Sequence, residues 1–441
     1  MNYRDTLKIN DKNHLQIGNF DATEIAKKFG TPLYVIDGNY VESVATVFDK
    51  TIKENYANSK VCYASKALSN MAMYKLIKKC GLGTDVVSYG EIYTALQAGI
   101  DAKDMYFHGN NKLEKELDYA ISNNVGVIVV DNLIELERID KIAKKYNKNQ
   151  DIIVRINPGV EAHTHTFVQT ATADSKFGSA IANDDAQIIM SKALEYKNIN
   201  LLGTHCHIGS QIFDKTAFKI AVEKVTDFAK EFASKYDFTF KIMNFGGGFG
   251  IYYTDEDVKY TIEEYADYVK NVASTFATCV KEKGLGCPML VIEPGRAIVG
   301  EAGITLYEVG SIKDIKGIRK YLNIDGGMFE NPRYALYNSK YSAILANRAN
   351  DKPVEKVTIA GKCCESGDII IKDIDLPKAN IGDIVAVFST GAYNYSMSSN
   401  YNSNFIPPMV MTYNNNIDYI VKPQTFEDLV RNNVVPEWLE K

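Results

Sequence analysis

Long apolar runs are missing from this 441-residue sequence, which has no uninterrupted apolar stretch that could cross a lipid bilayer. The first residues, from Met1 to Asp5, also lack the apolar region of a secretory signal. The seven cysteines are an odd number and no two have C-x-x-C spacing, so a disulfide framework is not expected. These absences predict a cytoplasmic protein with reduced thiols and no membrane partner.

A strong charge of either sign is also missing, because the formal net charge is only -5. Basic residues are scattered, as in Lys141, Lys144 and Lys145, which is typical of a solvated helix face. The sequence therefore does not indicate a nucleic-acid partner. With 46% hydrophobic and 24% charged residues, the composition is that of an ordinary globular protein, and no low-complexity linker divides it.

Short apolar, β-branched runs alternate with longer amphipathic segments such as 217–232 and 262–283. This alternation is typical of parallel βα units, and eight of them favour a closed (β/α)8 barrel over an open doubly wound sheet. The predicted strands are 61–64, 84–87, 105–108, 125–130, 152–156, 201–206, 241–245 and 289–292.

The chain has a different pattern after Pro294, where apolar runs at 304–309, 357–360 and 384–388 are separated by Gly, Asn, Asp and Pro without long helical segments. This predicts a second, mostly β domain. The early run 32–36 precedes the first barrel strand and is assigned to the same domain. We therefore expect an α/β protein with a barrel over residues 38–296 and a β domain formed by residues 1–37 and 297–441.

Residues suited to chemistry lie where the predicted barrel strands end. The carboxyl ends of the strands in such a barrel meet at one mouth, where barrel enzymes place their active sites. In chain order these residues are Lys66, Asp85, His108, Arg155, His207, the glycines Gly246, Gly247 and Gly248, and Glu293.

Three of these positions match the needs of a cofactor, although each has a simpler interpretation. Lys66 at a strand end is expected in a drier place than a surface lysine, which would favour attack on a carbonyl; alternatively it reaches out to water. The glycine-rich stretch 245–250 can surround a phosphate with backbone N–H groups, or form a tight turn. Glu293 needs a cationic or proton-sharing partner, which is either a pyridine nitrogen or Arg296.

The histidines leave several interpretations open. His205 and His207 are two residues apart in a predicted strand and would face the same side. With His163 and His165 they could be metal ligands, as in metal-dependent barrel hydrolases. Alternatively, His207 stacks on a cofactor ring, or both residues are buried histidines with ordinary hydrogen bonds.

Three polar, turn-like stretches lie in the predicted β domain, at 331–337, 363–368 and 391–395. Taken singly, each stretch can also be interpreted as a turn that carries surface aromatic residues. As a set with the barrel motifs, they resemble the fold-type III pyridoxal-phosphate decarboxylases, and within them the diaminopimelate decarboxylase family. The resemblance covers nearly the whole chain in the family's order and spacing. The matching stretches are 31–35, 63–67, 85–88, 175–178, 205–211, 246–250, 293–296, 331–337, 364–368 and 391–393.

The resemblance implies that Lys66 carries pyridoxal 5'-phosphate and that His207 stacks on its ring. It also implies that Cys364 donates a proton to the substrate and that Glu365 binds its far ammonium. Both would reach the site from the other subunit of a homodimer. The other implied cofactor contacts are Asp85, Ser210, Gly246, Gly247, Gly248, Glu293, Pro294, Gly295, Arg296 and Tyr393. The other implied substrate contacts are Arg296, Arg333, Tyr337 and Tyr393.

The implied reaction is decarboxylation of meso-2,6-diaminopimelate to L-lysine and CO2, the last step of lysine biosynthesis. The far end of that substrate is a whole amino acid, which two arginines and a glutamate match in charge. A decarboxylase of ornithine, arginine or carboxynorspermidine would have little use for Arg333. A racemase on a related barrel and an inactive regulator are further alternatives, and an inactive regulator is expected to lose Lys66 or Cys364. Tyr89 and Ala173 stand where the family favours glycine.

Overall fold

The computed structural model describes residues 7–160 and 175–440, so Ala173, His163 and His165 lie outside the described residues. The chain divides into two compact units. One, called here the barrel unit, consists of residues 41–252 and 257–298, and the other, the β unit, of residues 1–40, 253–256 and 299–441. The domain boundaries expected at residues 38 and 296 stay predictions.

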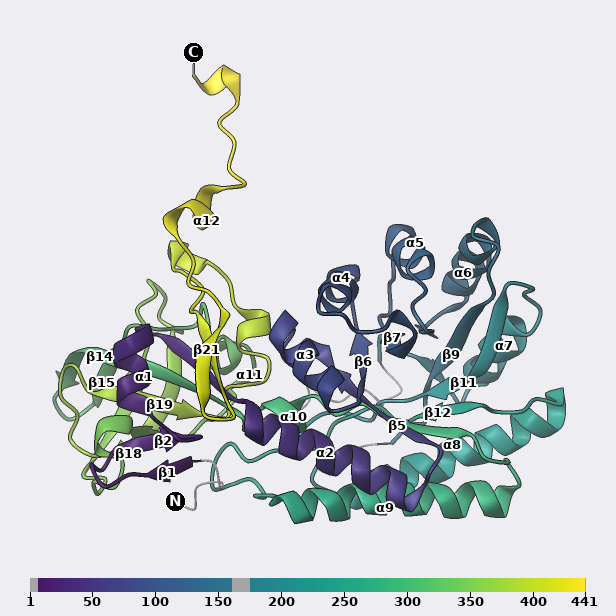
Figure 1. The fold of residues 1–441 in the computed structure, drawn as a ribbon, viewed down its shortest axis with the longest axis horizontal. Helices are drawn as coiled ribbons and strands as arrows, with labels where there is room; N and C mark the ends of the chain where they lie inside the picture. The colour runs from purple at the N-terminus through teal and green to yellow at the C-terminus, as the bar shows by residue number, and fades with distance from the viewer. Residues whose placement is uncertain (1–6, 161–174, 441) are drawn as a thin grey trace. The chain divides into compact units, whose positions relative to one another are not determined.

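Parallel strands of the barrel unit, several of which are labelled in Figure 1, pair with one another in a closed ring. They are hydrogen bonded in the order β9-β11-β12-β13-β5-β6-β7-β8, and β8 pairs again with β9. This confirms the predicted (β/α)8 barrel. The strands are β5 (Ser59–Ala64), β6 (Gly83–Val86), β7 (Met105–Phe107), β8 (Val127–Val130), β9 (Gln150–Asn157), β11 (Ile199–His205), β12 (Ile242–Asn244) and β13 (Met289–Ile292). The short strand β10 (Ser179–Ala180) pairs with β9 beside the ring.

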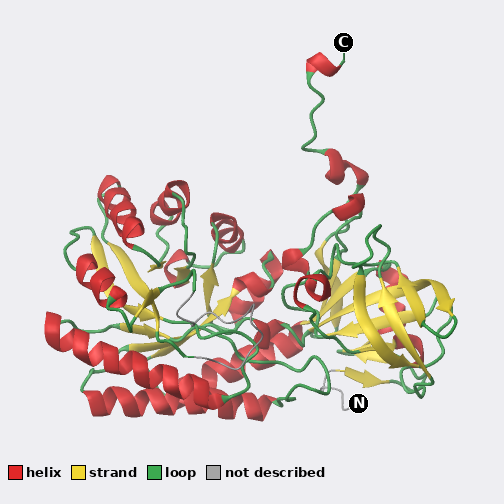
Figure 2. Ribbon diagram, turned by 180° about the vertical axis from the view of Figure 1, so that it is seen from behind, coloured by secondary structure: helices red, strands yellow, loops and turns green. Residues whose placement is uncertain are grey.

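Helices of the barrel unit lie around these strands (Figure 2). Several begin at a side chain that accepts a hydrogen bond from the first turn, among them Asn70, Ser88 and Thr261. The helices are α2 (Gly38–Asn55), α3 (Met71–Lys79), α4 (Tyr89–Gln97), α5 (Glu114–Ser122), α6 (Leu133–Lys145), α7 (Asp185–Ala193), α8 (Lys215–Tyr236), α9 (Ile262–Lys283) and α10 (Arg296–Val299). The 3-10 turns are η1 (Ser65–Ala67) and η2 (Ala102–Asp104).

The interior of the barrel is filled by one apolar cluster whose members come from strands all around the ring, including Tyr106, Ile242 and Val291. Side chains two positions apart on a strand point to the same face. The residues two positions beyond these three are His108, Asn244 and Glu293. The alternation that builds the apolar core therefore places three polar side chains on top of it.

The β unit is built on a sheet in the order β18-β17-β15-β14-β4-β20-β21, with β16 and β19 joined to it through β14. Strand β4 (Leu33–Asp37) pairs with β14 and β20, which confirms that the early run 32–36 belongs to this domain. The other strands are β14 (Gly303–Ile315), β15 (Arg319–Ile324), β16 (Ala343–Leu345), β17 (Glu355–Ala360), β18 (Ile369–Leu376), β19 (Ile384–Phe388), β20 (Met409–Tyr413) and β21 (Asn416–Val421).

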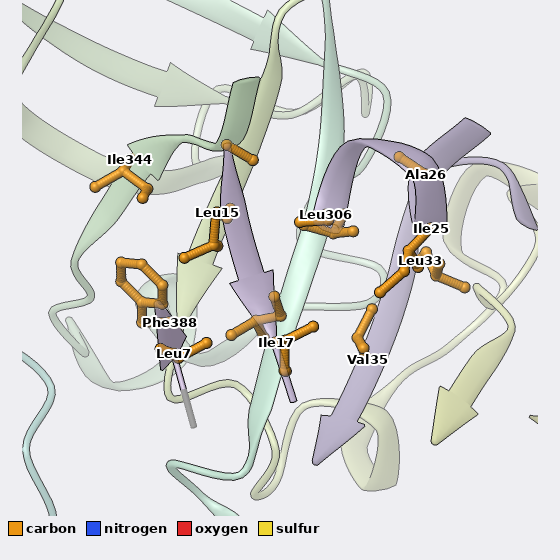
Figure 3. Close-up of a cluster of buried hydrophobic side chains, with 14 of the residues drawn as sticks. Leu7, Leu15, Ile17, Ile25, Ala26, Leu33, Val35, Leu306, Ile344 and Phe388 are labelled. Carbon is orange, nitrogen blue, oxygen red and sulfur yellow. The ribbon is translucent and has the colours of Figure 1, made fainter. Parts of the chain in front are cut away.

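An apolar cluster holds the N-terminal elements against this sheet (Figure 3). Leu15, Ile17 and Ile25 pack with Leu306 and Phe388, although they are nearly 300 residues or more apart in the chain. The small sheet consists of β1 (Leu7–Ile9), β2 (Leu15–Ile17) and β3 (Phe20–Asp21), and it is followed by α1 (Ala22–Phe29). The remaining elements are α11 (Arg333–Tyr337), α12 (Phe426–Val430), and the 3-10 turns η4 (Ala346–Arg348), η5 (Tyr395–Met397), η6 (Tyr401–Ser403) and η7 (Glu437–Leu439).

One local feature of the β unit differs from the sequence expectation. The stretch 331–337 was expected as a turn, but Arg333–Tyr337 forms a helix that starts after Pro332. Proline suits this position because no backbone N–H is needed at the start of a helix and the φ of proline is already close to helical. Among the described residues, no helix combines the length and the apolar character that a membrane crossing requires.

Candidate active site at the carboxyl ends of the barrel strands

The structure places the barrel residues singled out from the sequence at or just beyond the carboxyl ends of their strands. Since the strands are parallel, these ends form one rim. Lys66 lies in η1 after β5, Asp85 in β6, His207 and Ser210 in the loop after β11, the three glycines after β12, and Glu293 and Arg296 after β13. The roles expected of these residues stay predictions, but their shared location is now a fact of the fold.

Glu293 lies buried at this rim, with 4% of its surface exposed. Its Oε1 is 2.9 Å from His108 Nε2 and accepts a hydrogen bond from Asn244 Nδ2 at 2.5 Å. Its Oε2 is 3.1 Å from His205 Nε2. Burial alone would raise the pKa of Glu293, but the two imidazoles hold this pKa well below its ordinary value. The ion-pair partner considered from the sequence, Arg296, instead donates to Ser210 Oγ at 3.0 Å.

Asp85 is the second buried carboxylate of the rim. Burial raises its pKa, while His108 and Lys66 act in the opposite direction. Its Oδ1 has no hydrogen-bond partner among the described residues and lies 3.9 Å from His108 Nε2. Because an unpaired buried carboxylate oxygen is costly, this atom marks a place where a ligand bearing a proton or a positive charge is favoured.

The side chain of Lys66 is exposed, whereas its neighbours Ser65 and Ala67 are buried. The prediction that this lysine lies in a dry environment is therefore wrong for the single chain. The reason is that β5 ends at Ala64, so Lys66 lies beyond the strand rather than inside it. Next to it, Ser65 Oγ donates to Glu91 Oε2 at 2.9 Å, and burial raises the pKa of Glu91 to about 7.

The glycine loop after β12 is packed against two other loops of the rim. A Cβ on Gly247 would lie 2.1 Å from the carbonyl oxygen of Glu293, and one on Gly248 would lie 2.4 Å from that of Gly209. The φ angles of Gly246 and Gly248 are +64° and +112°, which side chains rarely allow. The backbone N–H of Gly247 points to His207 Nδ1 at 3.3 Å.

Gly247→Ala should therefore disturb the whole rim. The added Cβ has to displace the backbone after Glu293, and we expect a large loss of affinity for the cofactor that the resemblance implies, together with a loss of stability of about 1–3 kcal/mol from overpacking. Thermal unfolding and titration with pyridoxal phosphate measure the two effects. The control is Gly310→Ala, where the nearest atom is 3.8 Å from the new Cβ. Equal cofactor affinity in both variants would contradict a role of this loop in binding.

The β unit brings together three of the expected substrate contacts. Arg333 is 8% exposed, and its guanidinium lies 5.4 Å from the ring of Tyr337 and 5.3 Å from the ring of Tyr393. Its Nε has no hydrogen-bond partner among the described residues, and no carboxylate of that part of the chain pairs with it. A buried guanidinium without an anion is costly, so the site favours an anionic ligand.

Cys364 and Glu365 are both exposed in the turn between β17 and β18. Asp368, which is buried, shapes this turn by accepting hydrogen bonds from the backbone of Cys363 and Met328, each at 2.7 Å. The backbone N–H of Cys364 donates to Asn402 Oδ1 at 2.9 Å. The turn is thus held by its backbone, while the two expected functional side chains remain accessible.

The histidine arrangement differs from the metal pair considered from the sequence. β11 ends at His205, so His207 lies in the following loop instead of on the same strand face. The ligand-type atoms that come together, within 4.8 Å of one another, belong to His108, His205 and Glu293. The imidazole nitrogens contact the carboxylate oxygens directly at hydrogen-bond distance.

Comparison with known proteins agrees with this geometry. Residues 44–300 match the family model described as "Pyridoxal-dependent decarboxylase, pyridoxal binding domain". The chain is 46% identical over 422 residues to the diaminopimelate decarboxylase of Bacillus methanolicus, covering 96% of this chain and 97% of the relative. The chain belongs to the diaminopimelate decarboxylase family of pyridoxal-dependent decarboxylases.

Further relatives of this decarboxylase family cover the chain equally well. The diaminopimelate decarboxylase of Bacillus subtilis (strain 168) is 45% identical, with 97% of this chain and 96% of the relative aligned. A crystal structure of the diaminopimelate decarboxylase of M. jannaschii, solved in complex with L-lysine, superimposes with a TM-score of 0.92 at 35% identity and covers all of both chains. The predicted fold class and family are thereby confirmed.

Two rim residues of this decarboxylase were not assigned a role from the sequence. His108 was noted as the end of a strand, but only the structure shows it against Glu293. Asn244 immediately precedes the glycine loop. It lies two residues after Ile242, which belongs to the apolar cluster of the barrel, and this spacing could have indicated that Asn244 faces the same side. Tyr89, one of the two departures from the family, begins α4 and lies exposed beside the ring of Tyr119, at 6.4 Å between ring centroids.

Proposed function

We propose that the protein is a pyridoxal-phosphate-dependent carboxy-lyase that converts meso-2,6-diaminopimelate to L-lysine and CO2, the last step of lysine biosynthesis. The observation that carries this proposal is the match to curated diaminopimelate decarboxylases over nearly the full length of the chain, at 46% identity. A relative of the same name was crystallised with L-lysine, the product of the proposed reaction.

The barrel rim fits pyridoxal phosphate. Lys66 offers an accessible amine for covalent attachment, and Glu293 is a buried carboxylate of the kind that holds the proton of a pyridine nitrogen. The loop through Gly247 has no side chains that would keep a phosphate from its backbone, and Ser210 and Arg296 lie beside each other as phosphate donors. When bound, the cofactor supplies the electron sink that makes loss of CO2 feasible.

The remaining roles follow from the chemistry of the side chains. His207 would stack on the cofactor ring, and Asp85, with its unpartnered Oδ1, would balance charge near Lys66. Cys364 would deliver a proton to the substrate carbon that has lost CO2, with Lys66 as an alternative donor. The turn Glu293-Pro294-Gly295-Arg296 and Tyr393 would complete the contacts to the cofactor.

The far end of diaminopimelate accounts for the buried arginine of the β unit. Arg333 lies close to the rings of Tyr337 and Tyr393 and has no carboxylate partner in the described chain, so a substrate carboxylate would supply the missing anion. Arg296 would assist it, and Glu365 would take the far ammonium. A substrate without a far carboxylate would leave Arg333 unpaired, which favours diaminopimelate over ornithine or arginine.

Purified protein with pyridoxal phosphate should release CO2 and L-lysine from meso-diaminopimelate, and should turn over ornithine, arginine and lysine far more slowly. Arg333→Ala should lower kcat/KM for diaminopimelate by about 30-fold or more, because losing one member of a desolvated charge pair costs roughly 2–5 kcal/mol. The residual activity on ornithine should change little. Faster turnover of ornithine than of diaminopimelate would overturn the proposed substrate.

We also propose that the active form is a homodimer whose sites are shared between subunits. Two observations on the β unit support this. Cys364 and Glu365 are exposed, although their proposed roles require contact with substrate. Residues 425–440, which leave the sheet after β21 (Figure 1), expose a row of large apolar side chains of the kind that a partner protein usually covers. These are Phe426, Val430, Val434, Val435, Trp438 and Leu439, each 57–83% exposed.

A cytoplasmic location remains part of this proposal. All seven cysteines are free in the structure, which is typical of a reducing compartment. Cys364 in particular would lose its proposed function if it were oxidised in a disulfide.

A further inference from the structure

Glu293 is held by donors that come from three other places on the barrel ring. His205 ends β11 and Asn244 ends β12, and these two residues are register partners across the parallel pair. His108 follows β7, which is separated from β13 by β5 and β6 in the ring. Their contacts to the carboxylate measure 3.1, 2.5 and 2.9 Å.

Among the described residues, these donors leave one acceptor position of the carboxylate without a partner. A carboxylate offers about two acceptor sites on each oxygen. On Oε1 both are taken, by His108 Nε2 and Asn244 Nδ2. On Oε2 one is taken, by His205 Nε2. The backbone on either side is fixed as well, because the N–H of Glu293 donates to the carbonyl of Gly246 at 2.7 Å and the carbonyl of Pro294 accepts from the N–H of Ala64 at 3.2 Å.

The imidazole of His205 meets the carboxylate as a neutral donor. Its Nδ1 is buried and has no partner among the described residues, so a second proton placed there would be an unsatisfied buried donor. Burial also lowers the pKa of His205 to about 3. The proton therefore resides on Nε2, facing Glu293. A neutral donor forms a hydrogen bond to the carboxylate and leaves its negative charge in place. An arginine or a lysine would neutralise that charge.

We propose that His108, His205 and Asn244 are positioning residues that keep Glu293 ionised and direct the one open acceptor site of its Oε2 toward the protonated ring nitrogen of the cofactor. This inference rests on the proposed function and deepens it. The charge that holds the ring proton then resides on Glu293 alone. Removing one donor frees the carboxylate to rotate and weakens its hold on that proton, although no residue touching the substrate has changed.

The test compares His205→Leu, which removes the donor, with His205→Gln, which restores an N–H at similar reach. The holoenzymes are prepared with pyridoxal phosphate labelled with ¹⁵N in the ring. In His205→Leu the ring resonance should move toward that of the unprotonated pyridine, and kcat should fall about 10- to 100-fold, as for the loss of a hydrogen bond to a charged group. KM should change less than kcat. His205→Gln should recover most of both effects.

A second measurement needs no cofactor. Only six histidines are present, so selective ¹⁵N labelling of the apoprotein can assign each ring, and His108 and His205 should both carry the proton on Nε2. The matched control is His14→Leu, which removes a histidine that contacts a carboxylate, Asp21, at 2.9 Å in the β unit. This variant should leave the cofactor resonance and kcat unchanged.

Three outcomes would overturn the inference. One is a folded His205→Leu variant with wild-type ring resonance and kcat. Another is a stoichiometric metal ion in the wild-type protein that disappears in His205→Leu. If His205→Leu does not fold, Asn244→Leu replaces it, and an unchanged resonance there counts equally against the inference. Failure of the proposed function is distinguishable, because it would be a wild type that binds cofactor with a protonated ring but does not decarboxylate diaminopimelate.

Discussion

Replacing Lys66 by alanine should reduce decarboxylation by a factor on the order of 10³ or more, since a covalently acting amine has no substitute elsewhere on the rim. The structure supports this expectation because Lys66 is exposed and able to react, directly after β5. The variant should also lose the visible absorption of the bound cofactor. In the wild type, borohydride should link the cofactor irreversibly to the peptide that contains Lys66, and mass spectrometry of a digest identifies that peptide.

The control for this experiment is Lys75→Ala, which removes another exposed lysine, on the helix α3 that follows. It should retain the visible band and the wild-type rate. A borohydride adduct on a lysine other than Lys66, or a yellow and active Lys66→Ala protein, would show that the cofactor is attached elsewhere.

Cys364→Ala should lower kcat by about 10²–10⁴-fold, the usual contribution of a positioned general acid. Cofactor affinity should change little, because the turn that carries Cys364 is held by backbone hydrogen bonds to Asp368 and Asn402. Steady-state kinetics and cofactor titration separate the two effects. The adjacent Cys363 is the matched control, and Cys363→Ala should stay close to wild type. Equal losses in both cysteine variants would indicate damage to the turn and not loss of an acid.

The same turn permits a test of the shared site. Lys66→Ala and Glu365→Ala proteins should each be inactive, but subunit exchange between them should restore activity. A mixed dimer has one site with an intact Lys66 from one chain and an intact Glu365 from the other, so it should reach about half of the wild-type activity per dimer. Mixed dimers that are verified by mass and remain inactive would mean that Glu365 serves the site of its own chain.

The barrel was predictable because its signals are local and repeat eight times. Apolar runs of strand length alternate with amphipathic helices, and the structure has all eight strands within a few residues of the expected bounds, with β13 (Met289–Ile292) at the predicted residues. The same pattern located the rim, because Lys66, the glycine loop and Glu293 each follow a run of this kind. The family could be predicted because its motifs occur in the family's order and spacing. No single motif would have indicated it.

Contacts between distant parts of the chain were not predictable in the same way. No local sequence signal indicates that His108, which follows β7, meets Glu293, which follows β13, because that contact depends on closure of the ring and on its register. For the same reason His205 and His207 were grouped as neighbours on one strand. The strand in fact ends between them, and His205 instead contacts a residue 88 positions away.

The fold class, the residues available at the strand ends and the family could all be predicted from the amino-acid sequence, since these depend on periodicity and on motifs that fold as local units. The side chains that act together could be identified only in the folded chain. The position of Arg333 beside the ring of Tyr393 and the three donors around Glu293 both arise from how segments far apart in the chain come together in the fold. Hydrogen bonds and burial depend on distance in space, and distance in space is set by strand pairing and not by order along the chain.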